Sequence, residues 1–194
     1  MLFRSQSPSI SEINNIKKSV GFDKLDFGEY YILKKTENTY LDFSSIAKGY
    51  AVDFLSEYLI RKNILNFFIE VGGEVRANGI NLSGEEWVVG IENPFDEISR
   101  LYASIPINNK SIATSGNYKN FYSLNDSVFF HSINPKTGYP AYSNMISSSV
   151  ISENCFISDA YATSFMILGF EESKKILNDR KDRKSTRLNS SHQI

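Results

Sequence analysis

Asp159 and Thr163 are a pair of residues whose types and spacing could hold a metal ion. They lie four apart in the segment SDAYATS, and in a helix this spacing places two side chains on the same face, one turn from each other. A carboxylate and a hydroxyl, joined by carbonyl or phosphate oxygens, suit Mg²⁺, which often binds through one or two carboxylates and substrate phosphates. An Asp near a helix start and a small packing Thr would explain the same spacing without a metal, so the pair alone is weak evidence.

Asp42, Ser45 and Lys48 belong to the segment DFSSIAKGYAVD, in which a strand-like stretch leads through small residues into a helix. The amino end of a helix has free backbone N–H groups and the positive end of the helix dipole, so it favours an anion. Lys48 falls in the first turn, where a cation opposes the dipole, and an anionic ligand would remove this conflict. A merely solvated Lys48 is the simpler interpretation, because this local arrangement is common.

Two further segments combine loop-forming residues with polar side chains. His131, the one histidine apart from His192 near the chain end, precedes Ile133 and the turn NPKTGYP, whose prolines and glycine stiffen the loop. Its unperturbed pKa suits general-base work near neutral pH, although lone histidines are more often structural. The segment SIATSGNY ends a strand with Ser115 and Gly116, which form either a ligand-accessible edge or an ordinary hairpin turn.

The composition excludes several classes of protein. The 194 residues carry 21 Lys and Arg against 22 Asp and Glu, so no sequence-wide basic field is available for a nucleic acid or an anionic membrane. One cysteine and two histidines exclude a disulfide framework and a Cys/His zinc site, so we expect any metal to be held by oxygen. No apolar run reaches the roughly 18 residues of a membrane helix, and the start MLFRSQSPS has no signal-peptide pattern.

The elements that would position the amino-terminal candidates follow from periodicity and turn residues. A capping box of Ser9 and Glu12 predicts a first helix. Residues 29–35 and 39–43 are predicted to form a hairpin around the turn-like TENT. The clearest helical stripe in the sequence follows directly, over residues 45–63, and would carry Lys48 near its start.

Strand-like segments dominate residues 66–133, with GG, NG, SG, NP and ND pairs between them. One more strand over 144–152 precedes a helix over 157–168 and a short final helix over 171–179. Strands flanked by helices indicate an α+β fold, with helices against one side of a largely antiparallel sheet. The polar end, residues 179–194, lacks apolar periodicity and resembles non-native, adapter-derived sequence, so we expect it to add nothing to the core.

Six segments, taken in order, resemble the pattern of the ApbE family, the FAD:protein FMN transferases. They are DFSSIAKGYAVD, VGGEVRANG, WVVGIENP, SIATSGNY, HSINPKTGYP and SDAYATSFMILG. The resemblance runs from about Ile10 to about Leu177, and agreement over separated segments is more specific than any one of them. It implies an ApbE-like α+β fold. It also implies an enzyme that uses Mg²⁺, cleaves the pyrophosphate of FAD, releases AMP, and attaches FMN to a threonine hydroxyl of an acceptor protein.

The resemblance also implies roles for individual residues. Asp42, Lys48 and Ile133 match FAD-contacting positions, and Ser115, from the strand end described above, is added as a cofactor-binding candidate. The metal candidates are the main-chain oxygen of Ser45 and the side chains of Asp159 and Thr163. His131 matches the histidine proposed as the base that activates the acceptor hydroxyl. These roles supply what phosphoryl transfer needs: a charge-neutralising cation, donors to the pyrophosphate, and a base for the nucleophile.

The resemblance leaves the exact activity and the setting open. Some relatives use water to split FAD into FMN and AMP, and a flavin-binding protein without turnover would need no base. The family implies an acceptor that is a subunit of a membrane redox complex, with no nucleic acid, and a place on the periplasmic side of the inner membrane, lipid-anchored or secreted. Family members carry a longer amino-terminal part, with several flavin contacts, so residues 1–178 are expected to be the carboxyl-terminal part of such a domain.

Overall fold

The computed structural model describes residues 8–93, 101–116, 121–124, 127–130, 132–141, 145–179 and 186–190. Its helices are α1 (Ile10–Lys17), α2 (Ala47–Arg61), α3 (Cys155–Leu168) and α4 (Phe170–Asp179), with a short 3₁₀ turn, η1 (Phe22–Lys24). Its strands are β1 (Leu25–Phe27), β2 (Ile32–Lys34), β3 (Phe67–Val71), β4 (Glu74–Asn78), β5 (Trp87–Glu92), β6 (Leu101–Ile107), β7 (Lys110–Gly116), β8 (Phe121–Leu124), β9 (Ser127–Phe130), β10 (Met145–Ser152) and β11 (Thr186–Ser190). Within these ranges, no helix is both long and apolar enough to cross a bilayer.

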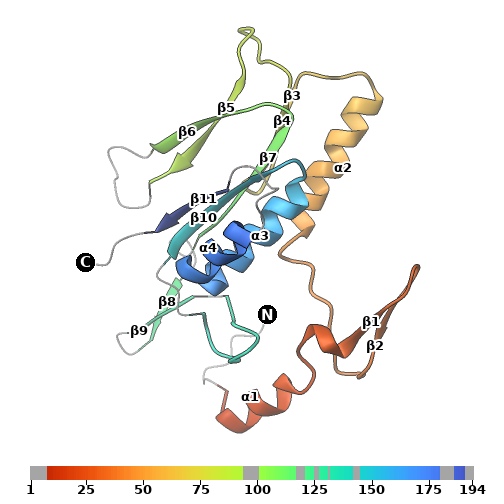
Figure 1. Ribbon diagram of the computed structural model, residues 1–194, viewed down its shortest axis with the longest axis vertical. Coiled ribbons are helices and arrows are strands. Elements are labelled where there is room, and N and C mark those ends of the chain that lie inside the picture. The colour runs from red at the N-terminus through yellow and green to blue at the C-terminus, as the bar shows by residue number, and fades with distance from the viewer. Residues whose placement is uncertain are drawn as a thin grey trace.

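A five-stranded sheet in the order β11-β10-β7-β4-β3 forms the centre of the molecule (Figure 1), and each neighbouring pair is antiparallel. Ala113 lies opposite Val150, and Ile112 lies opposite Val75. Since successive side chains of a strand point to opposite faces, the first pair and the second pair face opposite sides of the sheet. The register therefore gives the sheet two apolar faces to bury.

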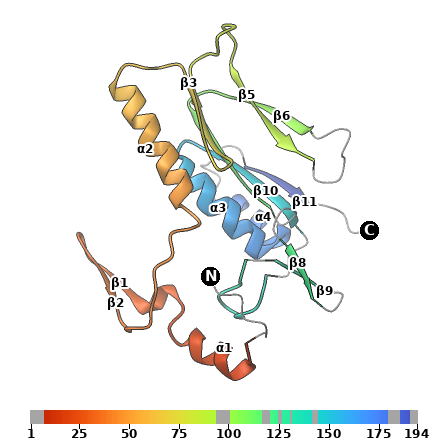
Figure 2. The same cartoon turned by 180° about the vertical axis from the view of Figure 1, so that it is seen from behind.

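Each face of the sheet has its own apolar cover. On one face, Ala113 and Val150 pack with Phe165 of α3, and α2 lies beside α3 on the same side (Figure 2). On the other face, Val75 and Ile112 pack with Ile107 of the β5–β6 hairpin. The structure thus has helix, sheet and hairpin layers, and it confirms the predicted α+β class with helices on one side of an antiparallel sheet.

Helices α2 and α3 cross in close contact because Gly49 has no side chain. A Cβ at this position would lie 2.6 Å from the carbonyl oxygen of Cys155. One turn further along α2, the Asp53 carboxylate accepts hydrogen bonds of 2.9 Å from the backbone N–H groups of both Cys155 and Phe156, and so caps α3. The same carboxylate pairs with Arg76 of β4 at 3.0 Å, which ties both helices to the sheet.

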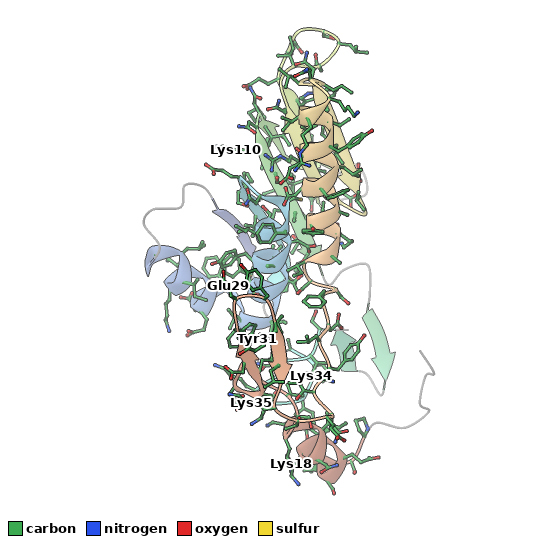
Figure 3. All side chains as sticks on the ribbon, turned by 90° about the vertical axis from the view of Figure 1, so that its right-hand side faces the viewer. Lys18, Glu29, Tyr31, Lys34, Lys35 and Lys110 are labelled. Carbon is green, nitrogen blue, oxygen red and sulfur yellow. The ribbon has the colours of Figure 1, made fainter. Side chains whose placement is uncertain are left out.

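An arm formed by α1, η1, β1 and β2 extends from this body (Figure 3, where Tyr31 and Lys34 are labelled). The capping box of Ser9 and Glu12 is confirmed at the start of α1. The predicted hairpin is wrong, because Ile32–Lys34 pairs with Leu25–Phe27 and no strand forms over 39–43. The Thr39 hydroxyl instead donates a hydrogen bond of 3.2 Å to the Ser19 carbonyl, and the residues after it form the connection into α2.

The carboxyl-terminal elements differ from prediction in detail. α3 begins at Cys155 rather than Ile157, because Asp53 satisfies its first N–H groups, and it ends before Gly169 as predicted. That residues 179–194 add nothing to the core stays a prediction, because the burial of their side chains is not described; their backbone nevertheless contributes β11 (Thr186–Ser190), which pairs antiparallel with β10. Backbone pairing at a sheet edge needs no apolar side chains, so periodicity could not reveal it. The non-native origin of this segment stays a prediction.

Candidate active site

One cleft, with a volume of about 1540 Å³, brings together segments that are far apart in the sequence. Every predicted cofactor or metal residue that the structure describes lies in its lining: Asp42, Ser45, Lys48, Ser115, Ile133, Asp159 and Thr163. They come from the loop before α2 and its first turn, the end of β7, the loop before β10 and the middle of α3. This cleft is larger than the roughly 300–1,000 Å³ of ordinary small-molecule sites, so it has room for a dinucleotide. His131 lies outside the described residues.

The Asp159 carboxylate lies at the crossing of α2 and α3. Only 2% of this residue is exposed, and its Oδ2 accepts a hydrogen bond of 3.0 Å from the Gly49 backbone N–H. Burial raises the pKa of Asp159, while the Gly49 hydrogen bond and the Lys48 charge oppose the rise. A carboxylate held at a cleft wall under these conditions favours a neighbouring cation.

The Thr163 hydroxyl supplies a second oxygen one helical turn further along α3. Its Oγ1 lies 3.1 Å from the Ser115 Oγ of β7, so a strand and a helix present two hydroxyls side by side. In the part of the chain that the structure describes, neither this site nor any other has three His, Cys, Asp or Glu side chains grouped to hold a metal ion. One carboxylate with neutral oxygens is a poor zinc site but fits Mg²⁺, which takes its remaining ligands from water and phosphate.

The Asp42 carboxylate organises the loop that leads into α2. Its Oδ1 accepts a hydrogen bond of 2.8 Å from the Ser44 backbone N–H and a second, short one from the Ser44 hydroxyl. These two bonds lower the pKa of Asp42, so the group stays ionised at neutral pH. This local turn fixes the main chain around Ser45 at the cleft wall.

The first turn of α2 differs from the simple anion site that the sequence suggests. The Gly49 N–H donates to Asp159, and the Ala47 N–H donates to the Phe43 carbonyl at 2.9 Å. Protein oxygens therefore satisfy much of this helix end. The expected conflict between Lys48 and the helix dipole is relieved by Glu74, whose Oε1 lies 2.6 Å from the Lys48 Nζ.

Glu74, which pairs with Lys48 but does not itself line the cleft, is one residue that sequence reasoning missed. In β4, Glu74 and Arg76 alternate with the apolar Val75 and Ala77, a pattern typical of a charged, solvated face. Instead α2 covers that face, and its Lys48 pairs with Glu74 as its Asp53 pairs with Arg76. The signal was the charge complementarity between α2 and β4, the second strand after it.

The loop that carries Ile133 is a compact turn. Ile133 bridges Pro140, and the Asn134 carbonyl accepts a hydrogen bond of 2.8 Å from the Gly138 N–H. Gly138 has a φ of 81°, a conformation that favours glycine. The turn holds the half-exposed Ile133 side chain at the cleft.

Two curated proteins from different bacteria that are similar to this chain carry the same name. The protein of Escherichia coli (strain K12) named FAD:protein FMN transferase is 33% identical over 176 residues, which are 89% of this chain and 50% of that protein. The protein of the same name from Buchnera aphidicola subsp. Schizaphis graminum is 34% identical over 171 residues, 86% of this chain and 50% of that protein. The chain therefore spans about half the length of the curated relatives it matches.

Solved structures agree with the sequence matches. The flavin transferase ApbE from Vibrio cholerae superposes with a TM-score of 0.79 at 28% identity, over 98% of this chain and 63% of that one. The apo flavinyl transferase ApbE of Pseudomonas stutzeri gives a TM-score of 0.79 at 26% identity, over 92% of this chain and 54% of that one. The sequence model of the ApbE family matches residues 2–186. Because this match covers nearly the whole chain, the protein belongs to the ApbE family.

Proposed function

We propose that this protein transfers FMN from FAD to a threonine hydroxyl of an acceptor protein, with Mg²⁺ and with release of AMP. One observation carries the proposal: the described residues that match the family's FAD and metal positions line a single cleft. The names of the curated relatives support the same activity. A shared cleft is what a reaction between a metal-bound pyrophosphate and an acceptor hydroxyl requires.

Four residues would bind the FAD. The Lys48 ammonium, half exposed in the cleft, would donate to an oxygen of the pyrophosphate. Ser115 and Asp42 offer a hydroxyl and an ionised carboxylate for the hydroxyl groups of the substrate, and Ile133 offers an apolar surface. Together these groups would fix the pyrophosphate in one orientation before transfer.

The metal would bind to oxygen atoms only. The Asp159 carboxylate, the Thr163 hydroxyl and the main-chain oxygen of Ser45 fit Mg²⁺ in type, and their shared place in the lining of the cleft supports the fit. When bound, Mg²⁺ neutralises charge on the phosphoryl oxygens and so stabilises the transition state. The protein's part is to hold these oxygens at the junction of α2 and α3.

The transfer step exchanges one P–O bond for another. The acceptor's threonine oxygen would attack the phosphorus of the FMN half, the bond to the bridging oxygen would break, and AMP would leave with that electron pair. The proton of the threonine hydroxyl would pass to the imidazole of His131, a role that rests on the resemblance alone.

The test is an incubation of the chain with FAD, Mg²⁺ and a threonine-bearing acceptor protein, followed by mass spectrometry of the acceptor. We expect a covalent FMN adduct and one AMP per adduct, with no adduct on an acceptor whose threonine is replaced by valine. AMP release that is equally fast without acceptor would instead establish FAD hydrolysis. Bound but unchanged FAD would establish a flavin-binding protein.

The acceptor and its location follow from the same proposal. We place the acceptor among the subunits of a membrane redox complex on the periplasmic side of the inner membrane, where the enzyme would be lipid-anchored or secreted. Family resemblance supports this placement. Fluorescent flavin bound covalently to a membrane subunit, lost on deletion of the gene and restored by its expression, would test it.

A further inference from the structure

We propose that Glu74 is a positioning residue for Lys48, whose ammonium group it holds at the cleft wall for an oxygen of the FAD pyrophosphate. The inference rests on the proposed function and deepens it, because it explains how a flexible lysine is prepared for its ligand. Glu74 itself is not among the residues that line the cleft. Its effect on FAD would therefore be exerted through Lys48.

The contacts of the Lys48 ammonium leave one side of it open. Its Nζ lies 2.6 Å from Glu74 Oε1 and 3.5 Å from the Gly72 carbonyl oxygen. The Glu74 side chain is 1% exposed, whereas the Lys48 side chain is 46% exposed and lies in the cleft. An ammonium group has three N–H donors, so two directed at the protein leave the third for a ligand oxygen.

Among the described residues, Lys48 is the only positively charged partner of the buried Glu74 carboxylate. Glu74 Oε2 has no hydrogen-bond partner in the described structure. Burial is the main cause that raises the pKa of Glu74, and the negative charge of the nearby Asp159 carboxylate raises it further. A buried carboxylate with one satisfied oxygen is costly, because desolvation is offset only by its partner. The Glu74 carboxylate therefore adds little to the stability of the fold. Holding the Lys48 ammonium group in place would be its role.

The β3–β4 turn is shaped around the lysine stem. Gly72 has a φ of 61°, and a Cβ at this position would lie 3.2 Å from the Lys48 Cδ and 3.7 Å from Glu74 Oε2. The lack of a side chain at Gly72 therefore leaves room for the methylene chain of Lys48, while the Glu74 carboxylate binds its ammonium group. A lysine free of such contacts would populate many rotamers, most of them pointing away from a given ligand.

Simple charge and positioning predict opposite results when Glu74 is neutralised. The negative charge of Glu74 by itself repels a phosphate, so its removal would tighten FAD binding if only charge mattered. If Glu74 positions Lys48, its removal weakens FAD binding, because the ammonium group must then be ordered at the moment of binding. The sign of the change therefore decides between the two accounts.

The experiment is a double-mutant cycle on the full chain, with the FAD dissociation constant measured by fluorescence quenching in the presence of Mg²⁺. We expect Glu74→Met and Lys48→Met each to weaken binding about tenfold, and the double variant to be no weaker than Lys48→Met alone. Glu74→Gln, which keeps an acceptor but loses the charge, should give an intermediate loss and serves if Glu74→Met does not fold. The matched control is Glu57→Met, which breaks an exposed ion pair with Arg61 on the same helix and should leave binding unchanged.

Thermal unfolding separates positioning from a purely structural ion pair. Lys48→Met should lower Tm because it leaves Glu74 buried and unpaired, and the double variant should recover Tm. Recovery of Tm together with additive or tighter FAD binding would overturn the positioning role while leaving the proposed function intact. A wild-type chain that binds no FAD would overturn both.

Discussion

The Asp159 carboxylate and the Gly49 backbone N–H form a buried hydrogen bond of 3.0 Å between residues that lie 110 positions apart. Gly49 also provides the gap through which the Cys155 backbone of α3 passes, 2.6 Å from where a Cβ would lie. One residue therefore sets both the approach of two helices and the orientation of the carboxylate proposed to bind the metal.

Replacing Gly49 with alanine tests this dual role. The added methyl would overlap backbone atoms of α3, so the helices must separate, and we expect a loss of about 2–3 kcal/mol in the free energy of unfolding. Urea denaturation measures this loss, and the rise of Tm with Mg²⁺ should shrink in parallel. Gly90→Ala is the control, because its methyl meets only the flexible end of Leu101. Equal effects of the two substitutions would contradict the prediction.

Asp159→Asn should separate metal binding from stability. The amide oxygen can still accept the Gly49 hydrogen bond, while the buried charge is removed, so we expect the metal-free variant to be at least as stable as the wild type at pH 7. Mg²⁺ at about 100 times its dissociation constant should stabilise the wild type by about 2.7 kcal/mol, and the variant not at all.

The difference in stability between Asp159→Asn and the wild type should change with pH in a definite direction. Burial raises the pKa of Asp159, so the folded state favours the protonated carboxyl, and this contribution is lost as the pH rises through the raised pKa. In EDTA, the stability of Asp159→Asn relative to the wild type should therefore increase between pH 4 and pH 7. A relative stability that falls over this range would show that the carboxylate is favoured in the folded state.

Local patterns predicted the elements of this fold better than their pairing. The helix predicted over 45–63 and the capping box at Ser9 each depend on residues within a few positions, and both were confirmed, the helix as Ala47–Arg61. Leu55 and Ile60 of the predicted apolar stripe are nevertheless exposed. The hairpin over 29–43 failed because Ile32–Lys34 pairs with the preceding Leu25–Phe27 instead of with residues 39–43, and both segments are short enough that the sequence did not rank the two partners. Backbone pairing of Thr186–Ser190 likewise left no pattern in the side chains.

Only those residues of the site that belong to recognisable sequence motifs could be predicted. The described residues of those motifs line one cleft, but their partners Gly49, Asp53 and Glu74 were not identified as such. These three act across elements: one permits a helix crossing, one caps another helix, and one pairs with a lysine 26 positions away. Such relations depend on tertiary packing, which a single sequence does not display.

Asp53→Ala should destabilise the protein more than the loss of an ordinary ion pair. The change removes the cap of α3 and leaves the largely buried Arg76 guanidinium without its carboxylate. Breaking one side of a buried pair typically costs about 3–5 kcal/mol. Glu57→Ala, which breaks the exposed pair with Arg61, should cost about 0.5 kcal/mol in the same chemical denaturation experiment.

The Cys155 thiol should report on the docking of α3 because the folded protein protects it. The side chain is buried, its Sγ donates to the Val75 carbonyl at 3.6 Å, and burial, followed by the Asp53 charge, raises the pKa of the thiol to about 12. At pH 8 the thiolate, which is the reactive form, would then be about one molecule in ten thousand.

We expect maleimide labelling of the native chain to be slow and limited by local opening, while the urea-unfolded chain reacts at its one cysteine within minutes. Labelling of Asp53→Ala should be faster than that of the wild type under native conditions, because the start of α3 then opens more often. Rapid labelling of the native wild type would place the thiol at the surface and contradict the packing of α3 against the sheet.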